Sequence, residues 1–114
     1  MNLLKIIVNA IDDVRVKDIK IYDTREVTPL FDYVIIATAN SSRQMQAVVN
    51  SIEEKEVEND FSIRGIEGVN GGLWTLIDLN DIIVNVFTAE ERLNYDLDKL
   101  WKNLPQIDCS ELLK

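Results

Sequence analysis

The stretch YVIIATANSS, residues 33–42, decides the fold of this chain. Its first six residues are mainly β-branched and apolar at consecutive positions, which is typical of a strand that is covered on both faces. Its last four residues break that run. Asn40, Ser41 or Ser42 can each cap a following helix, because their side-chain oxygens accept the free N–H groups of the first helical turn. The stretch therefore predicts a central strand that leads directly into a helix.

The flanking segments predict an α+β fold. Residues 4–14 carry apolar side chains at helical spacing, and residues 18–23 alternate as a short strand. Further strands are expected at residues 61–66, 73–79 and 82–87, the last two joined by a tight turn at Asn80-Asp81. A final helix is expected from Thr88, with Glu91 as capping-box partner, to the residue before Pro105. Together these elements predict an α/β sandwich with a mixed sheet of about five strands.

Length and cysteine content set the expected organisation. The chain has 114 residues, which suits one domain, and we expect that domain over residues 1–105 with a C-terminal tail at 106–114. No apolar run reaches the roughly 18 residues of a membrane span, and the start of the chain lacks the pattern of a signal peptide. The single cysteine, Cys109, cannot form an internal disulfide, so a cytoplasmic location is expected.

Charge excludes several function classes. Asp and Glu number 20 against 12 Lys and Arg, which gives a formal net charge of −8. This balance argues against a broad nucleic-acid surface, since phosphate binding depends on basic residues, but it permits a basic protein partner. Simple solubility is the alternative explanation of the charge. The chain has no histidine, so histidine-based catalysis and metal ligation are excluded.

Arg43 and Asp78 are the two residues on which an enzymatic function would depend. The N-terminus of the helix after residue 42, with Arg43, can hold an anion, and Asp78 is a candidate metal ligand, as in a nucleotidyltransferase. Two-metal phosphoryl transfer needs carboxylates that converge on ions roughly 4 Å apart. Two aspartates at i and i+2 would supply them, but Asp78 is followed two residues later by Asn80. The sequence predicts no catalytic residue, no metal and no cofactor.

Two tryptophans and a few polar residues have alternative explanations. Trp74 begins an expected strand and is either a core residue or an exposed anchor of the kind that dominates binding hot spots. Trp101 lies on the apolar stripe of the final helix and is expected in the core. Asn85 is polar in an otherwise apolar strand, so it marks a contact face or an internal hydrogen bond. Asp32 stands at the edge of the central strand.

Three ordered motifs resemble those of the Iojap-like ribosomal silencing factors. They are DYVIIATANSSRQ at residues 32–44, EG at 67–68 followed by WTLIDLNDIIVNVF at 74–87, and RLNYDLDKLW at 92–101. The resemblance extends from the first expected helix to the end of the third motif. The chain departs from the family where Ala39 and Asn80 replace the usual glycine and where Asn85 replaces the usual histidine. Asn tolerates the left-handed conformation that such a turn requires.

The resemblance implies a function in translation regulation. Family members bind the large ribosomal subunit at the protein that the uniform nomenclature numbers fourteen. They sterically block association with the small subunit and repress translation under nutrient limitation. Their fold is described as nucleotidyltransferase-like without the activity. For this chain the resemblance implies a binding protein that is not an enzyme, with no direct nucleic-acid binding and no membrane.

By this transfer, the contact surface is expected on the hairpin 74–87 and at the corner 32–33. Trp74 is expected to be an apolar anchor, and Asp78 and Asp81 are expected to pair with Lys or Arg of the partner. The full set of expected partner-binding residues is Trp74, Asp78, Asp81, Asn85, Asp32 and Tyr33, with Ser42 and Arg43 as second choices.

Two alternative functions remain open at this stage. The chain could be a nucleotidyltransferase-fold enzyme, or a maturation factor that binds the large subunit without silencing it. The free protein is also expected to self-associate, since a strand that is apolar on both faces needs cover that the expected helices do not fully supply.

Overall fold

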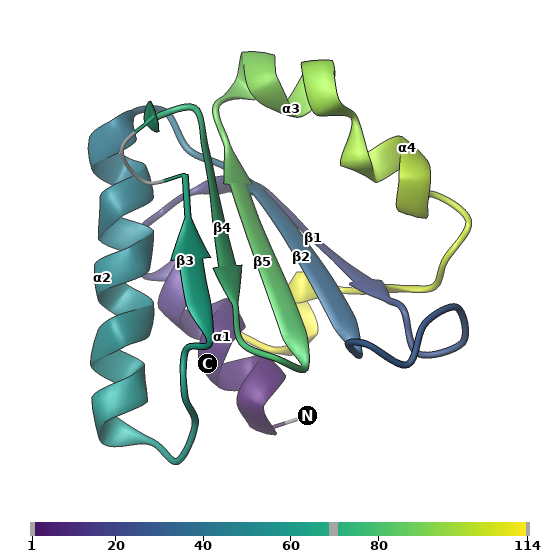
Figure 1. Cartoon of the computed structure of the whole chain (residues 1–114), viewed down its shortest axis with the longest axis horizontal. Coiled ribbons are helices and arrows are strands. Elements are labelled where there is room, and N and C mark those ends of the chain that lie inside the picture. The colour runs from purple at the N-terminus through teal and green to yellow at the C-terminus, as the bar shows by residue number, and fades with distance from the viewer. Residues whose placement is uncertain (1, 69–70, 114) are drawn as a thin grey trace.

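The computed structural model describes residues 2–68 and 71–113 and shows one mixed sheet flanked by helices (Figure 1). The strands are Lys17–Asp23 (β1), Tyr33–Thr38 (β2), Gly65–Glu67 (β3), Trp74–Asp78 (β4), Ile82–Phe87 (β5) and Gln106–Ile107 (β6). The helices are Asn2–Asp12 (α1), Ser42–Glu58 (α2), Ala89–Tyr95 (α3) and Leu97–Trp101 (α4), and a 3-10 turn spans Cys109–Glu111 (η2). None of the helices within the described ranges has the length and apolar character that a bilayer span requires.

The sheet confirms the predicted α+β class and its mixed strand directions. Its strand order is β3-β4-β5-β2-β1-β6. The two central strands, β2 and β5, run parallel, from Tyr33 beside Ile82 to Thr38 beside Phe87. All the other neighbouring strands pair antiparallel. The sheet has six strands where about five were expected, because β6 comes from the C-terminal segment.

Helices α1 and α2 cover one face of the sheet, which we call the helix-covered face. In Figure 1, α1 lies behind the strands and α2 lies along the β3 side. The main core fills the space between the helices and the sheet. Several of its members have no exposed surface, among them Ile7, Ile35, Ile52 and Val84. The apolar stripe of α2 faces this core, since Met45, Val48, Val49 and Ile52 are its buried residues.

The start of α2 follows from the short polar segment after β2. Among the three candidate caps, Ser41 is the one used, and its hydroxyl accepts a hydrogen bond from the backbone N–H of Gln44 at 3.1 Å. The Gln44 carboxamide in turn accepts the backbone N–H of Asn40 at 2.7 Å. This reciprocal pair satisfies free donors at the helix N-terminus, as a capping box does.

The strand expected at residues 61–66 is much shorter than predicted. Pairing with β4 covers only Gly65 to Glu67. Before it, the backbone N–H of Ile63 donates to the carboxylate of Glu56 at 2.6 Å. A side-chain acceptor from α2 thus replaces a strand partner, and the segment after α2 runs as irregular chain.

The prediction of a single final helix was also wrong, because the chain forms the two helices α3 and α4. Asp96 lies between them in the left-handed region, with φ 50° and ψ 47°. This conformation ends α3 and splits the expected apolar stripe, so Leu93 and Leu100 are 80% and 66% exposed. Trp101, expected in the core, is only partly buried, and it packs with the small second cluster of apolar residues.

The segment 106–113, expected as a tail outside the domain, packs onto the sheet. Gln106 and Ile107 pair with Tyr22 and Ile21 of β1. Leu112 is only 8% exposed in the main core, and its carbonyl accepts a hydrogen bond from the Asn9 side chain at 2.9 Å. Strand pairing, one side-chain hydrogen bond and the burial of Leu112 therefore attach this segment to the fold, although its sequence shows no strong pattern.

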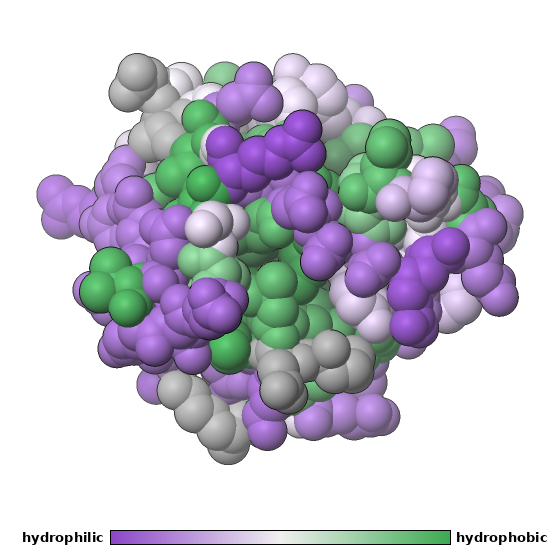
Figure 2. Space-filling model, turned by 60° about the horizontal axis from the view of Figure 1, so that its bottom comes forward, coloured by the Kyte–Doolittle hydropathy of each residue, from purple (hydrophilic) through white to green (hydrophobic). Residues whose placement is uncertain are grey.

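The second face of the sheet is covered only in part. α3 and α4 cross it near the end where β5 finishes, and the strands below them face the viewer in Figure 1. Seen from the end at which α1 begins (Figure 2), hydrophobic residues gather in a hollow that hydrophilic residues surround. Apolar surface thus reaches solvent at several places on this small fold.

Candidate functional site

The candidate site lies on the second face of the sheet, which we call the open face. Along β4 the side chains alternate: Thr75 and Ile77 are buried toward the helices, and Trp74, Leu76 and Asp78 are half-buried on the other side. Residues four apart in a strand point to the same face, and Trp74 and Asp78 do so here. On β5, the cross-strand partners of these three residues are Phe87, Asn85 and Ile83. Those six residues form the part of the open face that β4 and β5 contribute.

Trp74 is held in place by three contacts. Its indole Nε1–H donates to the side-chain oxygen of Asn85 at 3.0 Å. Its ring stacks on Phe87 with centroids 5.5 Å apart and planes 10° apart, and it meets Tyr95 of α3 at 5.0 Å. Phe87 is fully buried, whereas Tyr95 is 53% exposed. The indole is therefore part of a small aromatic cluster and is still partly exposed.

Asn85 makes the internal hydrogen bond that was one of its two predicted explanations. It is 3% exposed and faces the indole across the β4–β5 pair. The Asn85 oxygen accepts the indole N–H of Trp74, which would otherwise be left without a hydrogen-bond partner. Asn85 acts within the open face by orienting Trp74, and only a small part of its own surface is free for a partner.

Asp78 lies at the far end of β4 from Trp74 and is already engaged locally. One carboxylate oxygen accepts the backbone N–H of Asn80 at 2.8 Å, and the other lies 3.9 Å from Nε of Arg64. Asn80 has φ 74°, so asparagine does adopt the left-handed turn conformation predicted for it. A basic partner group would share Asp78 with these neighbours.

The corner at residues 32–33 separates into two different positions. Asp32 is exposed, and its backbone N–H donates to the carbonyl of Asp81 at 2.7 Å, which joins the corner to the hairpin turn. Tyr33 instead is 6% exposed and belongs to the helix-covered core, with the Arg25 guanidinium 5.4 Å from its ring centroid. Asp32 and Asp81 therefore lie together at the edge of the open face, and the expected place of Tyr33 on the contact surface was wrong.

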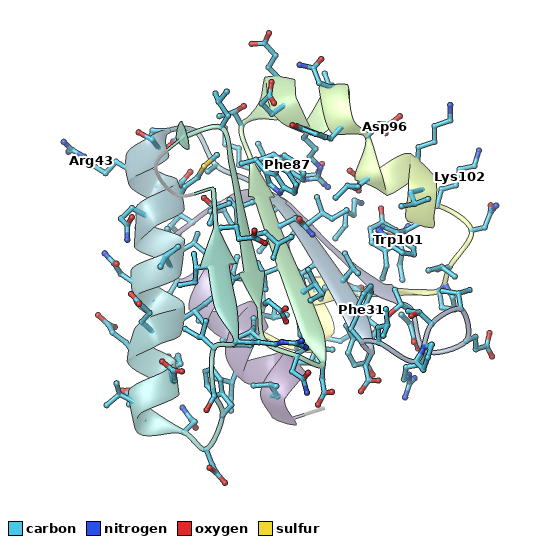
Figure 3. All side chains as sticks on the ribbon, viewed as in Figure 1. Phe31, Arg43, Phe87, Asp96, Trp101 and Lys102 are labelled. Carbon is cyan, nitrogen blue, oxygen red and sulfur yellow. The ribbon has the colours of Figure 1, made fainter. Side chains whose placement is uncertain are left out.

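Ser42 and Arg43 lie apart from this group, in the first turn of α2. Both are exposed. Figure 3 shows Arg43 extending outward from α2, away from Phe31, Phe87 and Trp101 on the sheet side. The structure thus brings together Trp74, Asp78 and Asn85, places Asp32 and Asp81 at their border, and separates the helix-corner residues from them.

A buried arginine fixes α3 and α4 over the open face. Arg92 is 8% exposed and donates twice to the carboxylate of Asp98, at 2.9 and 3.1 Å. It also donates to the carbonyl of Asp18 at 2.7 Å and the hydroxyl of Thr38 at 2.9 Å. Tyr22 donates its hydroxyl to Asp98 at 2.7 Å. We call these five residues the latch.

Ionisation within the latch follows from its geometry. Burial raises the pKa of Asp98, but the hydrogen bonds from Arg92 and Tyr22 and the charge of Arg92 outweigh it, so this pKa lies below its usual value. Burial and the hydrogen bond to Asp98 raise the pKa of Tyr22. The latch is therefore a carboxylate held between a guanidinium and a protonated phenol.

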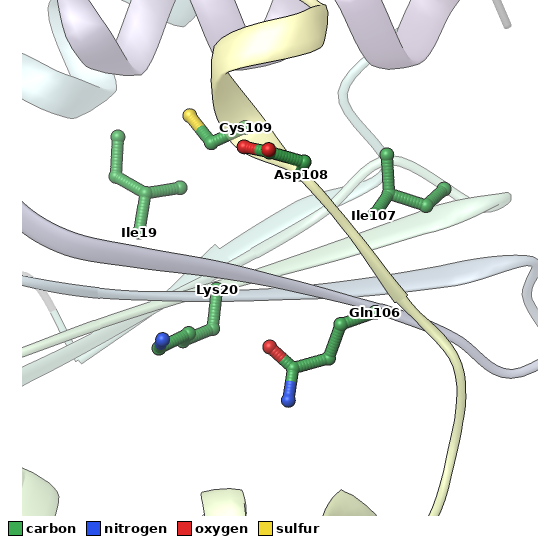
Figure 4. A pocket seen from close by; sticks show the side chains of 6 residues that line it. All are labelled: Ile19, Lys20, Gln106, Ile107, Asp108 and Cys109. Carbon is green, nitrogen blue, oxygen red and sulfur yellow. The ribbon is translucent and has the colours of Figure 1, made fainter.

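Cys109 lies in a different cavity, of about 340 Å³, next to β6 (Figure 4). Burial raises the pKa of its thiol, and the negative charges of Asp12 and Asp108 raise it further. A raised thiol pKa disfavours the nucleophilic thiolate. None of the predicted partner-binding residues lines this cavity.

Sequence reasoning missed the aromatic and aliphatic neighbours of Trp74. Leu76, Ile83 and Phe87 follow from the same alternation of period two that places Trp74 on the open face. Tyr95 had no such signal, since it comes from a helix whose end was predicted elsewhere.

The comparisons with known proteins agree with this fold. The family model described as "Ribosomal silencing factor during starvation" matches residues 1–114. The chain is 37% identical over 107 residues to the protein named ribosomal silencing factor RsfS from Bacillus subtilis, covering 94% of this chain and 91% of that protein. It is 26% identical over 99 residues to the chloroplastic protein Iojap of Zea mays, covering 87% of this chain and 43% of that protein.

Two solved structures are similar throughout. A crystal structure of a protein from Chromobacterium violaceum has a TM-score of 0.84 at 36% identity and covers 91% of this chain and 87% of that one. A crystal structure from Bacillus halodurans has a TM-score of 0.82 at 33% identity, with 94% and 97% covered. The three motifs, the fold and these matches agree, and the chain belongs to the ribosomal silencing factor family, which includes the Iojap proteins.

Proposed function

We propose that this chain binds the large ribosomal subunit in the cytoplasm through the open face, and that it thereby blocks association with the small subunit. The proposed contact is the large-subunit protein numbered fourteen in the uniform nomenclature. Relatives named ribosomal silencing factors support the ribosome as target. Translation would be repressed by this steric block, under nutrient limitation, without any catalytic step, metal or cofactor.

The observation that carries the proposal is the half-exposed Trp74 on a sheet face that helices leave partly uncovered. Interface hot spots are typically an aromatic anchor surrounded by apolar and polar contacts. Leu76 and Ile83 extend the apolar area, and the exposed Asp32 and Asp81 border it. A basic ribosomal protein would complement both the apolar centre and the acidic rim.

The decisive experiment is sedimentation of ribosomal subunits with and without the protein. We expect it to co-sediment with large subunits and not with small subunits, and to reduce the assembled ribosome peak when added before the subunits are mixed. An assembled peak that is unchanged at saturating protein contradicts silencing. Binding that is restricted to immature large particles would instead favour a maturation factor, and nucleotide transfer with Mg²⁺ that is lost in Asp78→Ala would favour an enzyme.

We also propose that the free protein self-associates through the open face, because exposed apolar area on a sheet favours a symmetric dimer. The partly exposed Leu76 and Ile83 would then be covered by a second copy. Light scattering over micromolar concentrations, compared between the unchanged protein and Leu76→Asp, measures this. A 13.1 kDa monomer at every concentration contradicts it.

A further inference from the structure

A small pocket opens beside Trp74 on the side of the sheet edge. It has a volume of about 110 Å³ and is lined by Glu67, Gly68, Trp74 and Leu76. The strand order places β4 between β5 and β3. Phe87 of β5 therefore stacks on one side of the indole, and the pocket lies on the other side, toward β3. The pocket is too small for a typical small-molecule ligand of several hundred Å³, but it suits one side chain.

The indole of Trp74 has no free hydrogen-bond donor for a group in this pocket. Its N–H group already donates to Asn85 at 3.0 Å, so it offers aromatic carbon surface and no free donor. The negative face of an aromatic ring attracts cations, and tryptophan is the strongest of the aromatic residues in this respect. Leu76 adds an aliphatic wall, against which the methylene stem of a long side chain can pack.

Glu67 and Gly68 line the pocket on the side toward β3. Gly68 has φ +84°, and a Cβ atom there would lie 2.1 Å from the carbonyl oxygen of Trp74, so no other residue fits without moving the chain. The register of β3 against β4 pairs Glu67, the residue before Gly68, with Leu76, and both residues line the pocket. Glu67 is exposed and forms no ion pair with any residue in the described part of the chain.

We propose that this pocket is the subsite for one basic side chain of the protein partner, with arginine favoured over lysine. A guanidinium can stack on the indole and pair with the carboxylate at once, because it is planar and weakly hydrated. No basic residue lines the pocket, and the chain carries a net charge of −8, so an anionic group is disfavoured there. The proposal rests on the proposed function for the identity of the partner, but not for the chemistry of the pocket.

The first experiment probes the pocket without ribosomes. N-acetyl-arginine amide is titrated into the protein, and the indole N–H resonance of Trp74 is followed by NMR, assigned with the Trp101→Phe variant. We expect a saturable shift that N-acetyl-norleucine amide, which lacks the charge, does not reproduce. We expect Glu67→Gln to weaken this shift, whereas Glu54→Gln, an exposed position on α2, leaves it unchanged. Equal responses to the two amides, or no response to either, overturn the proposal.

The second experiment measures large-subunit binding by the same protein. Glu67→Lys is expected to lower the affinity roughly tenfold or more, because like charges across an interface repel, and Glu54→Lys is its matched control. Equal affinities of the two variants overturn the proposal even if the unchanged protein binds well. If the unchanged protein does not bind large subunits although the arginine amide shifts the Trp74 resonance, the proposed function fails and the pocket chemistry stands.

Discussion

The two faces of the sheet are built by different rules. The helix-covered face packs aliphatic residues from α1, α2 and four strands into one continuous core. The open face carries a small cluster around Phe87 and Tyr22, and its cover is attached mainly by polar groups. The only buried residue of α3 is Arg92, and α4 has none. Burial of apolar area thus stabilises the first face, and a charged latch organises the second.

Because of this difference, one face of the sheet mainly stabilises the fold and the other is available for binding. A core of close-packed aliphatic residues supplies most of the free energy of unfolding. The open face, with its smaller cluster and half-exposed Trp74, supplies less of that energy and leaves area for a partner. Substitutions on the two faces should therefore affect different measurements, and the predictions below rank them from the largest effect to the smallest.

The largest effect is expected from truncation in the helix-covered core. Ile35→Ala removes a side chain with no exposed surface at the centre of β2 and should lower the free energy of unfolding by about 3 to 4 kcal/mol. Leu76→Ala, on the open face, should cost about 1 kcal/mol or less, since its side chain is already partly hydrated. Urea unfolding of both variants measures this. Similar losses in both would remove the distinction between the faces.

Loss of the latch should come next. Arg92→Leu leaves the Asp98 carboxylate partly buried without its cation, and we expect a loss of about 2 to 3 kcal/mol. Hydrogen exchange should rise in α3 and α4 more than in α2, because those two helices depend on the latch. Arg25→Leu, which removes a partly exposed pair with Asp23 and the contact with the Tyr33 ring, is the control and should lower stability much less. Exchange that rises uniformly would show that the latch supports the whole fold.

Trp74→Ala should change binding more than stability. Removing a hot-spot tryptophan typically costs about 2 kcal/mol or more of binding free energy, roughly a thirtyfold loss of affinity for large subunits. The ring is half-exposed, so a stability loss of about 1 to 2 kcal/mol is expected from the aromatic cluster. Thermal unfolding and subunit binding are measured on one sample. Trp101→Ala, which removes the other indole, should lower stability more than it lowers binding.

Asp78→Asn should weaken binding only a few-fold. The carboxylate already accepts a hydrogen bond from Asn80 and lies near Arg64, and both compete with a partner cation. Its effect should shrink as salt rises, because screening weakens the pair in the unchanged protein too. Binding measured at two salt concentrations tests this. A loss that grows with salt would exclude charge pairing at Asp78.

The smallest expected effect is acid sensitivity of the latch. The pKa of Asp98 is lowered in the fold, so its contribution to stability is complete above the ordinary aspartate pKa of about 4 and is lost as the pH falls through the lower folded value. Asp98→Asn should therefore reduce the difference in stability between neutral and acidic pH. An identical pH profile for the variant would show that Asp98 does not titrate as its environment implies.

The sequence by itself determined the elements with strong local signals. The apolar run at 33–38, the cap that follows it and the alternation along 74–78 each define a strand, a helix start or a shared face through interactions between near neighbours. For the same reason, the shared face of Trp74 and Asp78 and the left-handed turn at Asn80 could be predicted. The family motifs covered most of the same segments.

Only the tertiary structure decided the features that depend on distant partners. Tyr33 faces the helix-covered core because the register of β2 against β5 sets its side, and an apolar run on both faces carries no signal of which side is which. Asp96 breaks the last helix where Arg92 reaches Asp98 and the sheet. Leu112 closes the core with no strong pattern of its own, because its partners lie about a hundred residues earlier in the chain.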